Sequence, residues 1–315
     1  MLRFLVRRLA LLALTLFLTS ILVFAFTQLL PGDVARLILG RDAQETALEN
    51  LREELGLNEP VPAQYANWLM GFVTGDWGRA FTGGRPPIRP LVMDRMGKSI
   101  QLAVVTLVIS IPLSVTLGVI AGLRENTWID SAINVATLSV VGLPEFVTGL
   151  VLINVFALGL GWFPSGATLP ANAPLGETLR QLILPAVAAT FVLMAYVVRM
   201  TRAGVIDELK KPYVRTATLK GLPYRQVIIR HVLRNALLPT ITVIALSFGW
   251  LIGGLIVIEN VFSYPGLGRL LTAAVEDKDI PLMQASVMVT VFFFAAANLV
   301  ADLAYALLNP RIRLE

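Results

Sequence analysis

The sequence contains no cysteine and only one histidine, His231. The lack of cysteine excludes disulfides, thiolate metal ligands and a cysteine nucleophile. A single histidine cannot supply the paired ligands of a histidine-based zinc site. The Gly-x-Ser-x-Gly elbow of serine hydrolases is also missing. We therefore expect neither a catalytic residue nor a bound metal.

Charged residues are scarce as well, at 15% of the 315 positions, while hydrophobic residues make up 56%. Soluble domains carry about 25% charged residues, so the composition indicates an integral membrane protein whose first partner is the lipid bilayer. The net charge of +5 is typical of the Lys and Arg that gather in cytoplasmic loops. We expect no nucleic-acid partner.

Six long apolar runs, uncharged except for Glu145 in the third, are each about long enough to cross roughly 30 Å of hydrocarbon. The first run follows Arg3, Arg7 and Arg8 and lacks a small-x-small cleavage site, which predicts a retained helix with a cytoplasmic N-terminus. Six crossings also place the C-terminus, with Arg311 and Arg313, in the cytoplasm. The runs cover residues 9–32, 99–123, 133–158, 181–198, 235–258 and 280–301.

These runs predict an all-α integral membrane fold in three parts. Residues 1–32 form the first transmembrane helix, 33–98 form an extracytoplasmic helical subdomain, and 99–315 form a five-helix core. In the subdomain, Asp42 with Glu45 predicts a helix start, Gly56 a helix end, and Pro62 a second start. Residues 88–95 are expected to form a third short helix.

A basic loop at residues 199–239 lies between two of the uncharged runs, on the cytoplasmic side of the predicted topology. Lys211-Pro212 ends the preceding helix, residues 213–220 form a short helix terminated by Gly221, and Pro223 opens the next helix. A helix of two turns is marginally stable alone in water, so we expect it to dock on a partner. The alternative is a loop whose charge only sets the topology.

Two carboxylates fall inside a predicted span or directly at its end. Glu145 lies near the middle of the third span, where a bare carboxylate is costly. It either faces a central cavity and pairs with a substrate amine, or is neutralised within the bundle. Asp302 lies near the cytoplasmic end of the last span. An intramembrane aspartyl protease needs two carboxylates at one depth, which this pair does not provide.

The basic loop resembles the cytoplasmic signature of ABC importer permeases of the dipeptide, oligopeptide and nickel branch. The usual text there is similar to Tyr-Val-Arg-Thr-Ala-Arg-Ala-Lys-Gly-Leu; Thr218 and Leu219 depart from it, and residues 213–217 and 220–222 agree. Further similar pieces occur in the same order at residues 29–33, 75–78, 259–269 and 309–313. The chain is most similar to the permease subunit with the larger outer N-terminal subdomain.

This resemblance implies a type I importer permease with six transmembrane helices in the prokaryotic cytoplasmic (inner) membrane. It implies that the chain is not an enzyme and binds no cofactor, and that ATP with Mg is held by two separate ATPase subunits. The triplet Gly97-Lys98-Ser99 lacks the earlier glycine of a phosphate-binding loop, in agreement with this. Further implied partners are a homologous second permease, forming a heterodimer, and an extracytoplasmic solute-binding protein.

The resemblance also assigns expected roles to residues. Glu145 is a candidate for the translocation path because of its position inside a predicted span, and not because of the resemblance. The expected ATPase-coupling residues are Tyr213, Arg215, Thr216, Ala217, Lys220 and Gly221. The expected outer loop or gate consists of Tyr264, Pro265, Gly266 and Arg269.

The sequence does not decide which substrate is carried: dipeptides, oligopeptides, nickel complexes, glutathione and oligosaccharides are the alternatives. Two other classes of function differ in what they require. An intramembrane hydrolase would need a nucleophile or a carboxylate pair, and a self-contained channel or carrier would work without any ATPase subunit.

Overall fold

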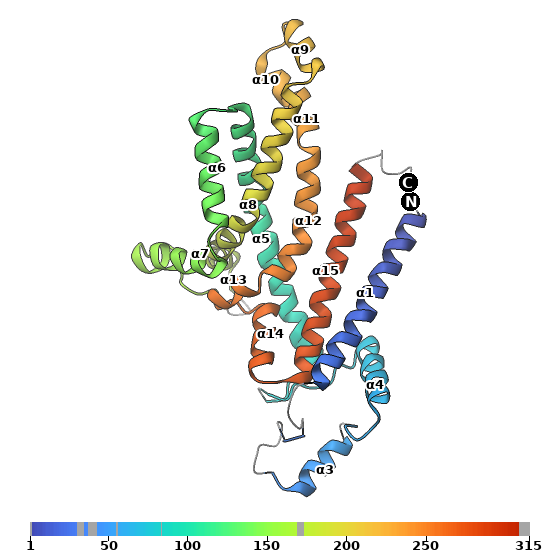
Figure 1. Ribbon diagram of the computed structural model, residues 1–315. Coiled ribbons are helices and arrows are strands. Elements are labelled where there is room, and N and C mark those ends of the chain that lie inside the picture. Colours follow the sequence, from blue (N-terminus) through green and yellow to red (C-terminus); the bar gives the residue numbers. More distant parts are fainter. Residues whose placement is uncertain are drawn as a thin grey trace. The chain divides into compact units, whose positions relative to one another are not determined.

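The protein is helical in the part of the chain that the structure describes (Figure 1). The computed structural model describes residues 2–29, 35–36, 43–54, 56–82, 84–168 and 173–308. These residues form no strand, only an isolated β-bridge between Arg79 and Pro87. The predicted all-α class is thereby confirmed. The predicted motif at 30–33, the capping residue Asp42 and the motif at 309–313 lie outside the described residues.

Two compact units divide the chain, one of Met1–Ser99 with Pro265–Ala295 and one of Ile100–Tyr264 with Ala296–Glu315. The first unit contains α1 (Leu2–Gln28), α3 (Glu45–Glu54), α4 (Val61–Thr74) and α14 (Leu267–Glu276). Two helices contribute to both units, α5 (Ile88–Leu123) and α15 (Ile280–Leu308). The second unit contains α6 (Trp128–Val141), α7 (Glu145–Leu152), η1 (Ile153–Gly159), α8 (Leu175–Leu209), α9 (Pro212–Leu219), α10 (Tyr224–Gln226), η2 (Val227–Val232), α11 (Leu233–Ala236), α12 (Leu238–Gly254) and α13 (Ile256–Val261).

Four of the described helices, α1, α5, α8 and α15, are long and apolar enough to cross a membrane. Two further pairs of helices pass the same test together but are bent. The number of spans rises to six if each bent pair is one span, which is the number predicted from the uncharged runs.

The third predicted span, residues 133–158, is not one helix. The chain bends by 104° between α6 and the helix formed by α7 and η1. The break falls at Gly142-Leu143-Pro144, and Pro144 lies just before α7 as its N-cap. Proline cannot donate a helical hydrogen bond and disfavours helical geometry in the residue before it. Glu145 does lie near the middle of this bent pair. It is the first residue of α7 rather than part of an unbroken helix.

Residues 88–95 are helical, but the prediction that they form a separate short piece is wrong. Residues 88–123 form one continuous helix, α5, of 36 residues. Gly97 lies inside it, and the preceding turn is bridged by an ion pair between Asp94 and Lys98, four residues apart, at 3.0 Å. A single glycine costs a helix only about 1 kcal/mol relative to alanine, which the neighbouring turns of this long helix readily offset.

In the first unit, α4 packs against α1 through aromatic side chains. The ring centroids of Phe24 and Tyr65 lie 5.4 Å apart, and the Tyr65 hydroxyl is 2.8 Å from that of Ser20. Pro62 lies in the first turn of α4, as predicted. Gly56, predicted to end the preceding helix, has a φ of +66°. The positive φ is the left-handed conformation in which helices commonly terminate.

The second unit is organised around α8, which contacts α6, α7, α11, α12 and α13. Figure 1 shows α8 running between α6 and α12. The buried residues of α8 include a group of small ones, Ala186, Ala188, Ala189 and Thr190. Small residues let helix backbones approach closely, which is how helices associate in a membrane. The helix extends beyond the predicted run of 181–198 at both ends.

Candidate functional site

The short helix α9 begins and ends one residue earlier than the predicted range of 213–220. Lys211 is its N-cap, Pro212 is its first residue, and Gly221 follows it with a φ of +75°. The Gly221 amide donates to the Thr218 carbonyl at 3.0 Å, which completes the turn. The next helix differs slightly from the prediction, because Pro223 precedes α10 as its N-cap rather than opening it.

One face of α9 is buried against the end of α8 and the chain that returns from α9. Val214 and Ala217 are 8% and 7% exposed. They pack with one residue of α8 and with the following helical segments; the other members of this cluster are Val205, Val227, Ile228, Val232 and Ala236. This hydrophobic contact holds a helix that would be marginal on its own.

The opposite face of α9 is exposed. Arg215, Thr216 and Lys220 are exposed, as is Leu219 at 79%. Tyr224, just past the Gly221 turn, is 66% exposed. An exposed leucine and tyrosine among bases form a mixed apolar and cationic surface at the tip of the second unit.

A polar network joins the start of α9 to α8 and α11. The Tyr213 hydroxyl donates to the carboxylate of Glu208, and Lys211 Nζ lies 2.5 Å from Glu208 Oε1. Asn235 Nδ2 donates to the Tyr213 hydroxyl at 3.2 Å. Burial raises the pKa of Tyr213, and its hydrogen bond to Glu208 raises that pKa further. The hydroxyl therefore keeps its proton and remains a donor. Lys211 forms its own hydrogen bond to Glu208, and this bond raises the pKa of Lys211.

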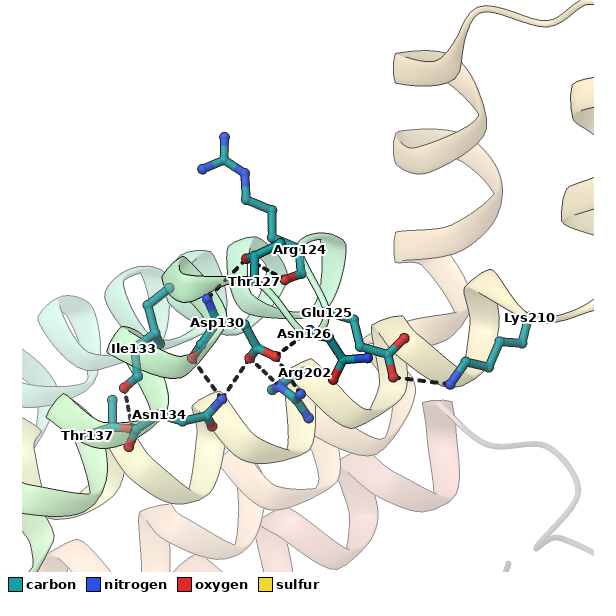
Figure 2. A network of polar contacts seen from close by, with 10 residues as sticks. All are labelled: Arg124, Glu125, Asn126, Thr127, Asp130, Ile133, Asn134, Thr137, Arg202 and Lys210. Carbon is teal, nitrogen blue, oxygen red and sulfur yellow. Dashed lines mark hydrogen bonds and ion pairs between the residues drawn. The ribbon is translucent and has the colours of Figure 1, made fainter.

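A second network ties the turn between α5 and α6 to α8 (Figure 2). Arg202 of α8 donates from Nε to Asp130 Oδ1 at 2.6 Å and from its terminal nitrogen to Asp130 Oδ2 at 2.7 Å. Asn134 Nδ2 and the Asn126 amide also donate to the Asp130 carboxylate, at 2.7 and 3.1 Å. Bidentate guanidinium–carboxylate pairs combine charge with a fixed orientation.

Glu145 is half-buried, and its backbone carbonyl accepts a hydrogen bond from the Thr148 hydroxyl at 2.8 Å. Within the described part of the chain, no basic side chain is paired with its carboxylate. Four residues on, Gly149 lies against Val261 of α13, where an added Cβ would be 2.9 Å from Cγ1 of Val261. Glu145 itself is the first residue of α7, directly after the bend between α6 and α7.

The predicted outer-loop residues are divided between the two units. In the second unit, Tyr264 is only 2% exposed and belongs to the hydrophobic core, with its hydroxyl 3.4 Å from Gln101 Oε1. In the first unit, the Pro265 carbonyl accepts from Arg95 at 3.2 Å. Gly266 is the N-cap of α14, and Arg269 lies in its first turn. Tyr264 is thus a packing residue in this conformation.

The sequence did not single out three of the residues that the structure makes prominent. Leu219 lies outside the resembling motif, yet its position two residues after the buried Ala217 places it on the outer face of α9. Asp130 and Arg202 are 72 residues apart, and no sequence signal pairs them. Among the described residues, no group of three His, Cys, Asp or Glu side chains could hold a metal ion.

Comparison with family models gives two matches that together span nearly the whole chain. Residues 114–314 match the model described as binding-protein-dependent transport system inner membrane component. Residues 1–116 match the model for the N-terminal part of such membrane components.

Curated relatives match over the same length. The glutathione transport system permease protein GsiC of Escherichia coli is 37% identical over 313 residues, which covers 99% of this chain and 99% of the relative. The protein of the same name from Shigella boydii is 38% identical with the same coverage.

A solved structure supports the fold. A chain of an amino acid ABC transporter crystallised with histidines superposes with a TM-score of 0.50 and covers 70% of this chain and 94% of that chain. Its sequence identity is 15%, so the likeness concerns the fold alone.

Proposed function

The chain belongs to the family of binding-protein-dependent transport system inner membrane components, and from this membership we propose how it couples to its partners. As a member of the family it is an integral inner-membrane permease of an ATP-driven ABC importer and not an enzyme, since the ATPase is a separate subunit. We propose that α9 is the element on which an ATPase subunit docks, with the α9 end of the second unit in the cytoplasm.

The observation that carries this proposal is the two-sided character of α9. Val214 and Ala217 anchor the helix inward, and the Glu208–Tyr213 bond fixes its start. The outward face, with Arg215, Thr216, Leu219 and Lys220, is therefore presented as a rigid surface, and Gly221 ends the helix at a defined point. Of the six predicted coupling residues, Ala217 and Tyr213 support the surface rather than form it.

The chemistry of this surface fits a groove of a soluble protein that combines apolar and acidic groups. Leu219 and Tyr224 supply apolar anchors, which are typical of the centre of protein interfaces. Arg215 and Lys220 supply charges that steer association with an acidic rim. The complete importer would contain two ATPase subunits, a homologous second permease as heterodimer partner, and a solute-binding protein on the outer side.

We further propose a short peptide such as glutathione as the transported solute. Two relatives that match this chain over 99% of its length bear the name of glutathione transport. In this proposal the half-buried Glu145, directly after the α6–α7 bend, attracts the ammonium group of such a solute. Mass spectrometry of the ligand that co-purifies with the cognate binding protein tests this assignment directly.

The docking proposal is tested by co-purification of the permease with its ATPase subunits. Leu219→Asp should lose the ATPase while the permease remains in the membrane, since a charge would replace the apolar anchor. Leu175→Asp is the matched control, because Leu175 is similarly exposed at 72% but lies at the opposite end of α8. Equal ATPase recovery with both variants would refute docking on α9.

A further inference from the structure

The end of α8 that precedes α9 packs closely against two helices, α5 and α12. On one side, a Cβ on Gly118 of α5 would lie 2.5 Å from Cβ of Thr201, and one on Gly122 would lie 2.7 Å from Cβ of Val205. On the other side, the Thr201 hydroxyl is 3.1 Å from that of Thr240. The last turns of α8 are therefore closely packed against α5 and α12.

The ion pair between Asp130 of α6 and Arg202 of α8, which we call the clamp, restricts how α6 is oriented against α8. Asp130 is 3% exposed, and both of its carboxylate oxygens accept two hydrogen bonds. The planar guanidinium of Arg202 matches the carboxylate with two parallel hydrogen bonds, which restricts the orientation of the pair. Rotating α6 against α8 would leave the buried Asp130 carboxylate and the partly buried Arg202 guanidinium without their partners. Such a loss of pairing is strongly unfavourable.

Helix α6 runs from this ion pair to the bend at residues 142–144. Asp130 lies in the first turn of α6, and the other end of α6 meets the 104° bend. Glu145 follows as the first residue of α7. One end of α6 is thus bound to Arg202, near the end of α8 that leads to α9. The other end leads into the bend that precedes Glu145, the candidate residue of the translocation path.

A second, exposed ion pair lies beside the clamp and provides an internal comparison. Glu125 of the α5–α6 turn pairs with Lys210 at the end of α8 at 3.2 Å (Figure 2). The Lys210 side chain is 64% exposed, whereas the Asp130 side chain is 5% exposed. Exposed pairs of this kind hold geometry weakly because solvent competes with them.

We propose that Asp130 and Arg202 are positioning residues of the transport cycle, which make α6 follow the end of α8. A displacement of α9 by the ATPase then reaches the α6–α7 bend through the clamp. This inference rests on the proposed docking of α9 on an ATPase subunit. The two residues touch neither ATP nor solute, and they act by keeping ATP hydrolysis and solute movement in step.

The test uses the complete importer in proteoliposomes with its binding protein, and measures solute uptake and ATP hydrolysis together. Arg202→Lys keeps the charge but loses the bidentate fork, and Asp130→Asn keeps the size but loses the charge. For both variants we expect uptake per ATP hydrolysed to fall about fivefold or more, the lower end of typical allosteric coupling, with hydrolysis remaining near the native rate. Lys210→Gln, which breaks only the exposed pair, should leave the ratio unchanged.

A distance measurement separates a positioning role from general destabilisation. The chain has no cysteine, so Ser131→Cys and Asp207→Cys, at two exposed positions on α6 and α8, introduce its only thiols for spin labels. With cysteine-free partners, the native clamp should give one narrow distance distribution with and without ATP. Arg202→Lys should broaden that distribution when ATP is bound.

Two results would overturn the proposal: uptake and hydrolysis lost in parallel, or a normal uptake per ATP in Arg202→Lys with a narrow distance distribution. If Asp130→Asn does not accumulate in the membrane, the milder Arg202→Lys decides. The Leu219→Asp variant separates the two levels of inference. If Leu219→Asp loses the ATPase while Arg202→Lys transports normally, only the clamp is refuted. If Leu219→Asp retains the ATPase, the docking of α9 itself is refuted.

Discussion

Gly204 of α8 lies against the backbone of Ala236 in α11, so closely that a Cβ on Gly204 would be 2.3 Å from the Ala236 carbonyl oxygen. Real Cβ atoms do not approach a backbone oxygen to this distance. The contact joins the helix before α9 to the chain that returns from it, and only glycine fits there. The helix before α9 and the chain that returns from α9 are therefore in direct backbone contact.

We expect Gly204→Ala to destabilise the protein by about 1–3 kcal/mol, since the added methyl group must push two helix backbones apart. The measurement is the thermal unfolding midpoint of the purified permease in detergent. Gly176→Ala is the control in the same helix, because a Cβ there meets nothing within 4 Å. An unchanged midpoint for Gly204→Ala would show that the two helices separate freely.

The bounds of α9 could be predicted from the sequence because the signals that set them are local. Pro212 and Gly221 act on their own turn of backbone, so the residues alone specify where the helix starts and stops. The bend before Glu145 also has a local signal in Pro144, but the length of the apolar run outweighed it in the prediction. Proline alone would not have been a sufficient guide, because Pro112 and Pro185 lie inside continuous helices.

The pairing of Asp130 with Arg202 could not be predicted. It depends on how α6 packs against α8, and each residue alone is an ordinary charge near the end of a predicted span. The exposed position of Leu219 could have been found, because Val214 and Ala217 define the buried face of a short helix. The outward direction of neighbouring residues then follows from helical geometry.

Replacing Gly221 tests whether the helix must end where it does. Gly221→Ala forces an L side chain into a left-handed conformation at a cost of about 1–2 kcal/mol, although no neighbouring atom lies within 4 Å of the added methyl group. We expect weaker ATPase binding and lower uptake with normal membrane insertion. Gly221→Asn is the comparison, since asparagine tolerates this conformation; equal loss in both variants would argue against a backbone cause.

Asp279 anchors the loop at residues 81–82 to the start of α15. Its Oδ2 accepts from the amides of Phe81 and Thr82, at 2.7 and 3.0 Å, and from the Thr82 hydroxyl at 3.0 Å. Asp279→Asn replaces a charged acceptor with a neutral one, and should destabilise this anchor by about 1–3 kcal/mol. Limited proteolysis near residues 81–82 should accelerate. Asp277→Asn, at an exposed position nearby, should leave the cleavage rate as it is, and faster cleavage there would point to a general charge effect.

Glu145→Gln tests the proposed contact between the translocation path and the solute. The substitution keeps the size and the hydrogen-bonding capacity of the side chain but removes its charge, so it should spare the fold. If the carboxylate attracts an ammonium group, losing about 1.4 kcal/mol of that attraction should lower uptake of the solute about tenfold at subsaturating concentration. A solute analogue with an acetylated amine should be carried equally by both proteins.

The control is Glu177→Gln, because Glu177 also lies in the first turn of a helix, α8, and is exposed. Removing it alters the electrostatics of a helix N-terminus in the same way as removing Glu145. If both variants lower uptake equally, the effect belongs to the helix ends rather than to the path. If Glu145→Gln changes uptake of the amine and of its acetylated analogue by the same factor, Glu145 contributes to the bend between α6 and α7 and does not contact the ammonium group.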